Sequence, residues 1–238
     1  MAQEGEVRTR FGYPVEAFPK PCEGPNGMQW SDEGLWVVDQ VHDDAYLLDE
    51  SGKVLRKFRT VTENSSGVTV GGGYLWTASN GTTALRPFRS TDTHRSAVLK
   101  LNPWDGGLLD RFPTTESEYI HGIEWDNGLM WITAFSPESL VLVDPRDFRV
   151  VRKFLVHMKR PHGLAVEGGG IWCAHTSDKV ILKYHKETGR VIDSISLPKE
   201  GPAPHGLATR NGELWYCDIA PMSGIYRVAM KNTQSMRL

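Results

Sequence analysis

The sequence predicts an all-β protein, a single β-propeller of five four-stranded blades with its ring closed by an N-terminal strand. Two observations predict this fold class. A glycine followed nine residues later by a tryptophan recurs five times at intervals of about 40 residues, and no window shows a sustained helical period. A repeat of about 40 residues with several short strands is typical of propeller blades. The five pairs are Gly27–Trp36, Gly67–Trp76, Gly122–Trp131, Gly163–Trp172 and Gly206–Trp215.

Each repeat reads as four strands, and the fourth repeat shows the pattern most clearly. Its expected strands are Gly163–Val166, Ile171–Ala174, Val180–Tyr184 and Arg190–Leu197. Asn127-Gly128 and Asn211-Gly212 stand between the first and second strands of other repeats, where Asn-Gly favours a two-residue hairpin turn. The fixed tryptophan of each repeat is expected to pack between neighbouring sheets.

The fifth repeat is incomplete, because only a short polar tail follows its third strand at Gly224–Met230. We expect a strand within Val7–Phe18 to supply the missing outer strand and so to close the ring and cover a sheet edge. The whole chain, 1–238, is then one domain, with blades beginning near residues 26, 66, 121, 162 and 205.

The interval between Trp76 and Trp131 is longer than the others, which places an insertion at about residues 80–95, after the second strand of blade two. A long loop at that point is expected to overhang the central opening as a lid. Arg86 and Arg89 within it are candidates for binding a carboxylate or another anion of a small-molecule substrate. The alternative is a solvated surface loop.

The residue before each repeat glycine begins an innermost strand, so ring symmetry should bring these five side chains together at one mouth. Imidazole is the commonest ligand of transition metals, and three histidines with an open position are typical of a catalytic site. We therefore expect a divalent metal ion (zinc, iron, manganese or magnesium), held by the three histidines, with Asn26 as candidate fourth ligand and Ser66 near the substrate. The alternative is that each histidine bonds a backbone carbonyl in a tight turn. The five residues are Asn26, Ser66, His121, His162 and His205.

A second ring of polar residues is expected at the same face, three residues after each tryptophan. Asp39, His175 and Asp218 in this ring are candidate proton-transfer groups, although aspartate at such a position also caps turns. Tyr119 and Glu118 precede an innermost strand. Tyr119 is a candidate acid or base, or else a residue packed at the rim, and Glu118 is a candidate for contacting the substrate.

Composition excludes several partners. The chain has 27 Lys and Arg against 29 Asp and Glu, a formal charge of −2, which gives no reason to expect nucleic acid or an anionic membrane. No apolar run suits a signal peptide or a membrane span, so the cytoplasm is the expected compartment. Three cysteines without a CxxC pair predict free thiols. Phosphate-binding loops, GxSxG elbows and HExxH motifs are absent from the sequence.

The run Pro-His-Gly-Leu-Ala, followed by a turn glycine, an Ile/Leu-Trp pair and a turn such as Lys186–Gly189, resembles the NHL-like and virginiamycin B lyase-like propellers. That resemblance implies a central metal and histidine that open an ester by elimination. The peptidyl-hydroxyglycine amidating lyases are similar in holding zinc with three central histidines, which would match His121, His162 and His205. Pro25-Asn26-Gly27 resembles the cation-binding Asn-Gly motif of the gluconolactonase and regucalcin family. Most of these relatives have six or seven blades.

Together these observations predict a metal-dependent enzyme acting on a small molecule, with elimination as the expected reaction. Hydrolysis of a lactone or ester by metal-bound water is the first alternative. A propeller that binds a ligand or a protein without catalysis is the second. The substrate and the oligomeric state are not predicted by the sequence.

Overall fold

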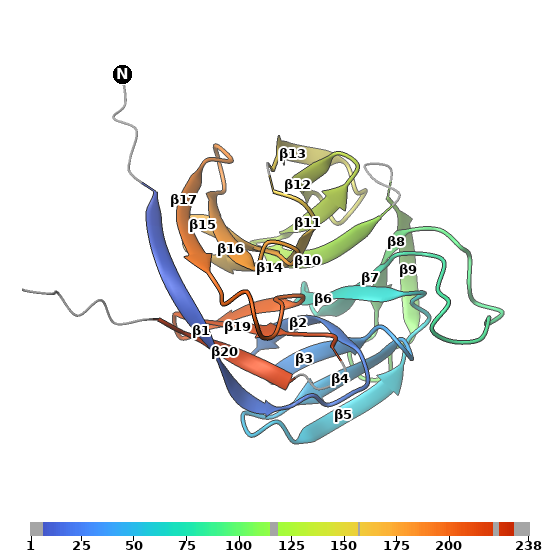
Figure 1. Cartoon of the computed structure of the whole chain (residues 1–238). Coiled ribbons are helices and arrows are strands. Elements are labelled where there is room, and N and C mark those ends of the chain that lie inside the picture. Colours follow the sequence, from blue (N-terminus) through green and yellow to red (C-terminus); the bar gives the residue numbers. More distant parts are fainter. Residues whose placement is uncertain (1–6, 115–118, 157, 221–223, 231–238) are drawn as a thin grey trace, which may run out of the picture.

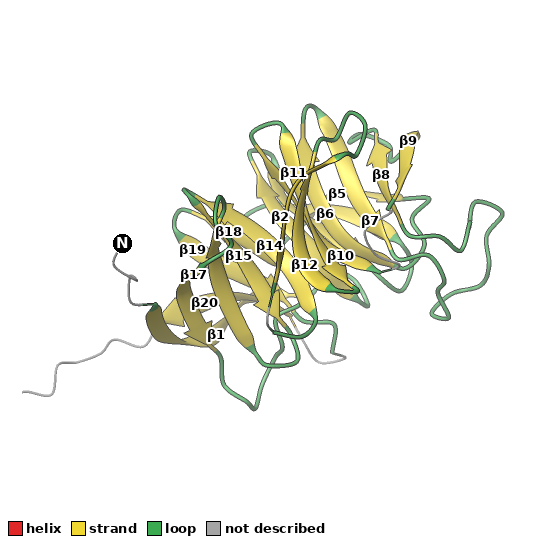
Figure 2. Cartoon of the chain, turned by 90° about the horizontal axis from the view of Figure 1, so that it is seen from above, coloured by secondary structure: helices red, strands yellow, loops and turns green. Residues whose placement is uncertain are grey.

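The computed structural model describes residues 7–114, 119–156, 158–220 and 224–230, and in these residues it contains strands and loops but no helix (Figure 2). The strands form five blades around a central axis (Figure 1), as predicted. In each blade the chain runs from the innermost strand outward through antiparallel neighbours, because short connections favour the pairing of consecutive strands. No helix of the described residues could span a bilayer.

The first three blades are separate four-stranded sheets. Blade one comprises β2 (Pro25–Ser31), β3 (Gly34–Asp39), β4 (Asp44–Leu48) and β5 (Val54–Arg59). Blade two comprises β6 (Ser65–Gly71), β7 (Tyr74–Ser79), β8 (Ala97–Leu101) and β9 (Leu108–Pro113). Blade three comprises β10 (Ile120–Asp126), β11 (Leu129–Phe135), β12 (Glu138–Val143) and β13 (Val150–Leu155).

The last two blades are joined into one eight-stranded sheet by the N-terminal strand β1 (Arg8–Pro19). Blade four comprises β14 (Pro161–Glu167), β15 (Gly170–His175), β16 (Val180–His185) and β17 (Val191–Ser196). Blade five comprises β18 (Leu207–Arg210), β19 (Glu213–Cys217), β20 (Gly224–Met230) and part of β1.

Strand β1 closes the ring as predicted and also bridges two blades. Its residues Gly12–Pro19 pair antiparallel with β20 as the outer strand of blade five. Its first residues, Arg8–Phe11, pair in parallel with β17 of blade four. One strand therefore covers the outer edges of both blades, which removes two exposed sheet edges at the seam of the ring.

The repeat tryptophans are buried on the second strand of every blade, with relative exposures between 0 and 9%. Trp131 of blade three shows their role, because it packs in one cluster with Leu164 and Ile171 of blade four. The tryptophans therefore fill the space between neighbouring sheets, as predicted. The predicted hairpin turns are also present, and Asn127 and Gly128 adopt φ values of 51° and 88°.

The repeat glycines form the narrowest part of the ring. A Cβ added to any of these glycines would collide with a backbone carbonyl oxygen of the next blade, the one that belongs to the residue before that blade's own glycine. The distance would be 2.8 Å or less for Gly27, Gly67, Gly122 and Gly163, and 2.9 Å for Gly206, which meets the Asn26 carbonyl. Any side chain here would therefore push two inner strands apart. The space that the five glycines enclose is only about 10 Å³, room for about one water molecule, so a ligand at the mouth does not pass through the axis.

Candidate functional site

Strand pairing places the two predicted polar rings at one face. Pro25 pairs with Asp39 and Pro161 with His175, so the start of each innermost strand lies beside the end of the second strand. The first ring contains the residues that precede the glycines, and the second contains the residues that follow the tryptophans. We call this face the mouth.

Three imidazoles lie side by side at the mouth. The ring centroids of His121 and His162 are 4.0 Å apart, and those of His162 and His205 are 5.1 Å apart. Phe135, at the end of β11, lies against both His121 and His162, with ring centroid distances of 4.6 and 5.6 Å. The structure therefore brings the three predicted histidines together, with an aromatic side chain closing one side of the group.

The arrangement of these rings does not fit the predicted metal ion. Two imidazoles that bind one tetrahedral ion at about 2.0–2.1 Å have centroids about 5 Å apart, because their nitrogens point to a common centre. His121 lies closer to His162 than this, with a centroid distance of 4.0 Å and an angle of 34° between the two ring planes. Within the described residues, no group of three or more His, Cys, Asp or Glu side chains is placed to hold a metal.

Burial keeps two of the imidazoles uncharged. It lowers the pKa of His121 to about 3, and repulsion from His205, when that ring is protonated, and from Arg160 acts in the same direction. Burial also holds the pKa of His162, which is 2% exposed, well below its ordinary value, with smaller contributions from His121, His205 and Arg160. At neutral pH both rings are therefore neutral and each carries one N–H.

His205 is held by a carboxylate and a carbonyl. Its Nδ1 lies 3.3 Å from the Ala203 carbonyl oxygen and 3.4 Å from Oδ1 of Asp218. Both neighbours are acceptors, so Nδ1 carries the proton and Nε2 keeps its lone pair. Burial opposes the ionisation of Asp218, but hydrogen bonds from His205 and from the N–H groups of Ala203 and Ala220 hold its pKa below the ordinary value. The arrangement can accept a proton at Nε2 and stabilise the resulting imidazolium.

Asn26 and Ser66 complete the first ring and are almost fully buried. Asn26 Nδ2 donates to the Ser65 carbonyl at 3.1 Å, and its Oδ1 has no partner among the described atoms. The Ser66 hydroxyl donates to the Ile120 carbonyl at 2.9 Å. The hydroxyl therefore links blades two and three, and its role toward a substrate stays a prediction.

The other two predicted proton-transfer groups, Asp39 and His175, are already bonded to other protein groups. Asp39, fully buried, accepts from the N–H groups of Gly24 and Val41 and contacts His42 Nδ1 at 2.9 Å. This is the capping role that the sequence left open as the alternative. His175 is buried inside blade four with its Nε2 2.9 Å from the Tyr184 hydroxyl, and burial lowers its pKa to about 4.

Two predicted residues precede β10. Tyr119 is 53% exposed next to the first residue of this strand. Glu118 lies outside the described residues. Their predicted roles toward a substrate stay predictions.

The insertion does not form a cover over the mouth. Only its base reaches the histidines, where Asn80 Nδ2 lies 3.4 Å from His121 Nε2, and the rest runs outward beyond blade two (Figure 1). Arg86 is 4% exposed and bonds Asp43 at 2.6 Å and Asp92 at 2.7 Å. Arg89 donates to the carbonyl of His42. An anionic ligand would have to displace these partners, so ligand binding by either arginine stays a prediction.

Sequence reasoning missed several groups around the site. Arg160, directly before Pro161-His162, places its charge near two of the rings. The signal in the sequence that could have identified it is an arginine directly before a Pro-His-Gly motif. On the far side of the glycines, Gln29 Nε2 bonds Thr69 and Glu124 across the axis at 2.6 and 2.9 Å, and burial raises the pKa of Glu124 to about 8. The repeat analysis singled out none of these three residues, so the sequence did not predict this second polar layer along the axis.

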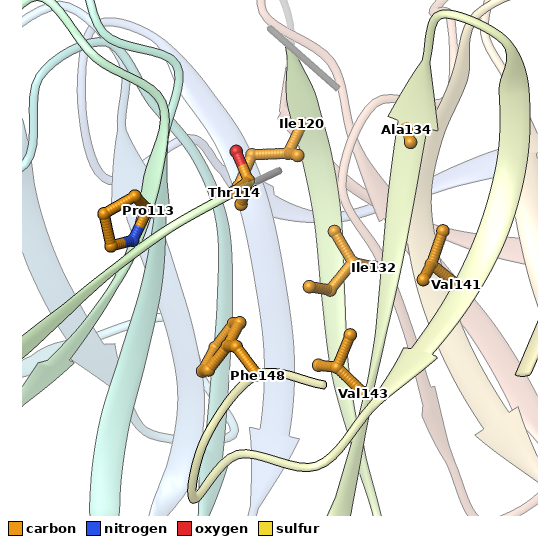
Figure 3. A pocket seen from close by; sticks show the side chains of 8 residues that line it. All are labelled: Pro113, Thr114, Ile120, Ile132, Ala134, Val141, Val143 and Phe148. Carbon is orange, nitrogen blue, oxygen red and sulfur yellow. The ribbon is translucent and has the colours of Figure 1, made fainter. Parts of the chain in front are cut away.

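A small apolar cavity of about 20 Å³ lies between blades two and three (Figure 3). Ile120 and Ile132 of blade three line it, with Phe148 and Pro113 opposite. Its size suits one or two small groups at most, and none of its lining side chains is charged. We therefore place the chemistry at the mouth and not in this cavity.

The neutral imidazoles predict a pH dependence of stability. Below about pH 6.5 an unfolded chain protonates His121, whereas the folded chain does so only near pH 3, so the unfolded state binds more protons and stability falls as the pH falls. The loss amounts to at most about 1.4 kcal/mol per pH unit. Glu124 acts in the opposite sense between about pH 4.5 and 8.

Urea unfolding of wild type and His121→Gln at pH 7, 6 and 5 isolates the imidazole, because Glu124 is common to both. The free energy of unfolding of the variant should fall less steeply with acidity. Thr188→Ala, in the turn between β16 and β17 at the opposite face, removes no titratable group and should retain the wild-type slope. Parallel slopes for wild type and His121→Gln would contradict a neutral buried ring.

The fold has clear counterparts among solved structures. The glutaminyl cyclase of Myxococcus xanthus superposes with a TM-score of 0.72 at 13% identity, over 95% of this chain and 100% of that one. The WD40 β-propeller domain of Doa1 gives 0.57 at 14% identity, over 87% and 64% of the two chains. A luciferin-regenerating enzyme gives 0.55 at 14% identity, over 91% and 80%.

These likenesses define the class as a β-propeller, in agreement with the sequence prediction. No protein-family model matches the chain, and no curated protein matches it by sequence. The resemblance to the NHL-like and virginiamycin B lyase-like group is therefore supported only at the level of the propeller fold.

Proposed function

We propose that this protein is an enzyme that acts on a small molecule at the mouth, with His205 as general base and Asp218 as its positioning residue. The observation that carries the proposal is the contact of His205 Nδ1 with Asp218 and the Ala203 carbonyl. It fixes the tautomer with a free Nε2 lone pair, which is the arrangement that catalytic histidines use. Neutral His162 beside it offers a hydrogen-bond group without competing charge.

Elimination is the reaction that we propose first. His205 Nε2 would remove a proton from the carbon next to a carbonyl, the C–H electron pair would form a C=C bond, and the bond to a leaving oxygen would break. The leaving group departs as a carboxylate, or it takes up the proton from the His205 imidazolium and departs as an alcohol, and Asp218 stabilises the imidazolium while it exists. This reaction needs no metal ion, in keeping with the geometry of the three rings, and it retains the lyase chemistry that the resemblance to the virginiamycin B lyase-like propellers implies.

A substrate panel tests the function and separates its alternatives. Esters and lactones with an acidic C–H are incubated in ¹⁸O-labelled water. Elimination produces an absorbing double bond without ¹⁸O, whereas hydrolysis places ¹⁸O in the acid product. Because a glutaminyl cyclase shares the fold, peptides with N-terminal glutamine form a third arm, read by release of ammonia. A protein that turns over none of these substrates would favour the non-catalytic binding propeller.

His205→Asn should lower turnover of any accepted substrate by about 10²–10⁴-fold, the usual contribution of a general base. Asp218→Asn should lower kcat less and change the pH profile of kcat, because it alters how the imidazole is held and not whether a base is present. The control is His185→Asn at the opposite face. Full turnover by His205→Asn would overturn the assignment.

A further inference from the structure

An exposed arginine lies beside the histidines. Arg160 lies in the segment that leads into β14, two residues before His162, and its side chain is exposed. It forms no ion pair with any described residue, in contrast to Arg86 with its two carboxylates. Its φ of 50° is uncommon for a residue with a side chain, and such strained positions concentrate where function requires them.

The charge of Arg160 reaches the buried rings. After burial and the neighbouring imidazoles, it is a further cause of the low pKa of both His121 and His162. Arg160 also directly precedes Pro161, which pairs with His175 at the mouth, so the arginine lies at the mouth at the start of blade four. The next blade carries the opposite charge, since ionised Asp218 lies beside His205 on blade five.

The tautomer of His121 adds a donor to this side of the mouth. Asn80 Oδ1 accepts from the Ile120 N–H at 3.0 Å, so Nδ2 of the same amide faces His121 Nε2 at 3.4 Å. His121 Nε2 is then the acceptor, and the proton of the neutral ring is on Nδ1. This Nδ1 is buried and has no partner among the described atoms, and the same holds for His162 Nε2.

We propose that Arg160 binds an anionic group of the substrate, a carboxylate or a phosphate ester, at the side of the mouth formed by His121 and His162. The cation suits such a group, because arginine recognises both kinds of anion in bidentate geometry, and the buried, unpartnered Nδ1–H of His121 lies in the adjoining histidine cluster. The inference rests on the proposed function, because it places the anion opposite His205 and so directs the reacting carbon toward Nε2. It differs from the sequence prediction in assigning the anion to Arg160 and not to Arg86 or Arg89.

Matched probes test the charge preference. Propionate, methyl phosphate and neutral propionamide are titrated at constant ionic strength into ¹⁵N-labelled protein, with the imidazole ¹H–¹⁵N signals as readout. Propionate or methyl phosphate should shift the signals of His121 and His162, and the stronger of the two identifies the anion. Propionamide should bind at least tenfold more weakly. Equal binding of propionate and propionamide, or no response to either anion, would overturn the proposal.

Variants assign the effect to Arg160. Arg160→Gln should weaken anion binding at least tenfold, and Arg160→Lys should restore part of it. Arg190→Gln is the matched control, because Arg190 is also exposed and forms no ion pair with a described residue, but lies in the turn before β17 at the opposite face. Wild-type anion affinity in Arg160→Gln would overturn the assignment.

His205→Asn separates this proposal from the proposed function. It should retain Arg160-dependent anion binding while turnover is lost. Retained turnover with Arg160-dependent binding would reject only the base, and lost turnover with Arg160-independent binding would reject only the anion site.

Discussion

Trp131→Ala is expected to lower the free energy of unfolding by about 3–5 kcal/mol, the range for removing a large aromatic side chain from a core. Trp131 is fully buried, packs against Phe154 with a centroid distance of 5.4 Å, and lies in one cluster with side chains of blade four. Its Nε1 also donates to Asp126 at 3.0 Å, so the substitution removes a partner of that carboxylate as well. The loss therefore combines a cavity between two blades with a missing hydrogen bond.

Denaturant unfolding followed by far-ultraviolet circular dichroism measures this loss. Trp104→Ala is the matched control, because Trp104 is 66% exposed in the turn between β8 and β9. Its ring contacts Arg56 at the surface, so its replacement should cost less than about 1 kcal/mol. Similar losses at both positions would contradict the assignment of the repeat tryptophans to the space between blades.

The fold could be predicted because one physical requirement recurs five times. Each blade needs a residue without a side chain where the inner strands meet and a large aromatic side chain where the sheets diverge. The glycine and the tryptophan that meet these two needs recur in the sequence at a fixed spacing. The closing strand followed from the strand missing in the fifth repeat. Its parallel contact with β17 could not be predicted, because the residues of β1 alternate in the same way whichever blade they join.

The site could be predicted in position but not in detail. Repeat symmetry placed His121, His162 and His205 at one mouth, since equivalent positions on adjacent blades must be neighbours. Symmetry does not set the side-chain torsions, and these decide whether the nitrogens converge on an ion or the rings pack closely against each other, as His121 and His162 do. The partners of Arg86 could not be predicted from the sequence either, because Asp43 and Asp92 meet it only through the folding of two loops.

Gly122→Ala should be among the most disruptive small substitutions in the chain, although it adds a single methyl group. The new Cβ would lie 2.1 Å from the His162 carbonyl oxygen and 3.0 Å from the Leu164 side chain. A carbonyl of an inner strand cannot rotate away, because Thr133 Oγ1 bonds both the Gly122 N–H and this same oxygen. Overpacking of a side chain costs about 1–3 kcal/mol, and this contact with backbone should reach at least about 3 kcal/mol.

The comparison with Gly169→Ala separates sterics at the axis from the general effect of a methyl group. A methyl group on Gly169, in the hairpin between β14 and β15, would meet no other atom within 4 Å, so this replacement should leave stability unchanged or raise it by up to about 1 kcal/mol. In Gly122→Ala the imidazole signals of His162 should also shift, because the displaced carbonyl belongs to that residue. Equal stability of the two variants would mean that the inner strands can separate freely, and the close contact that holds the histidines together would then lose its role.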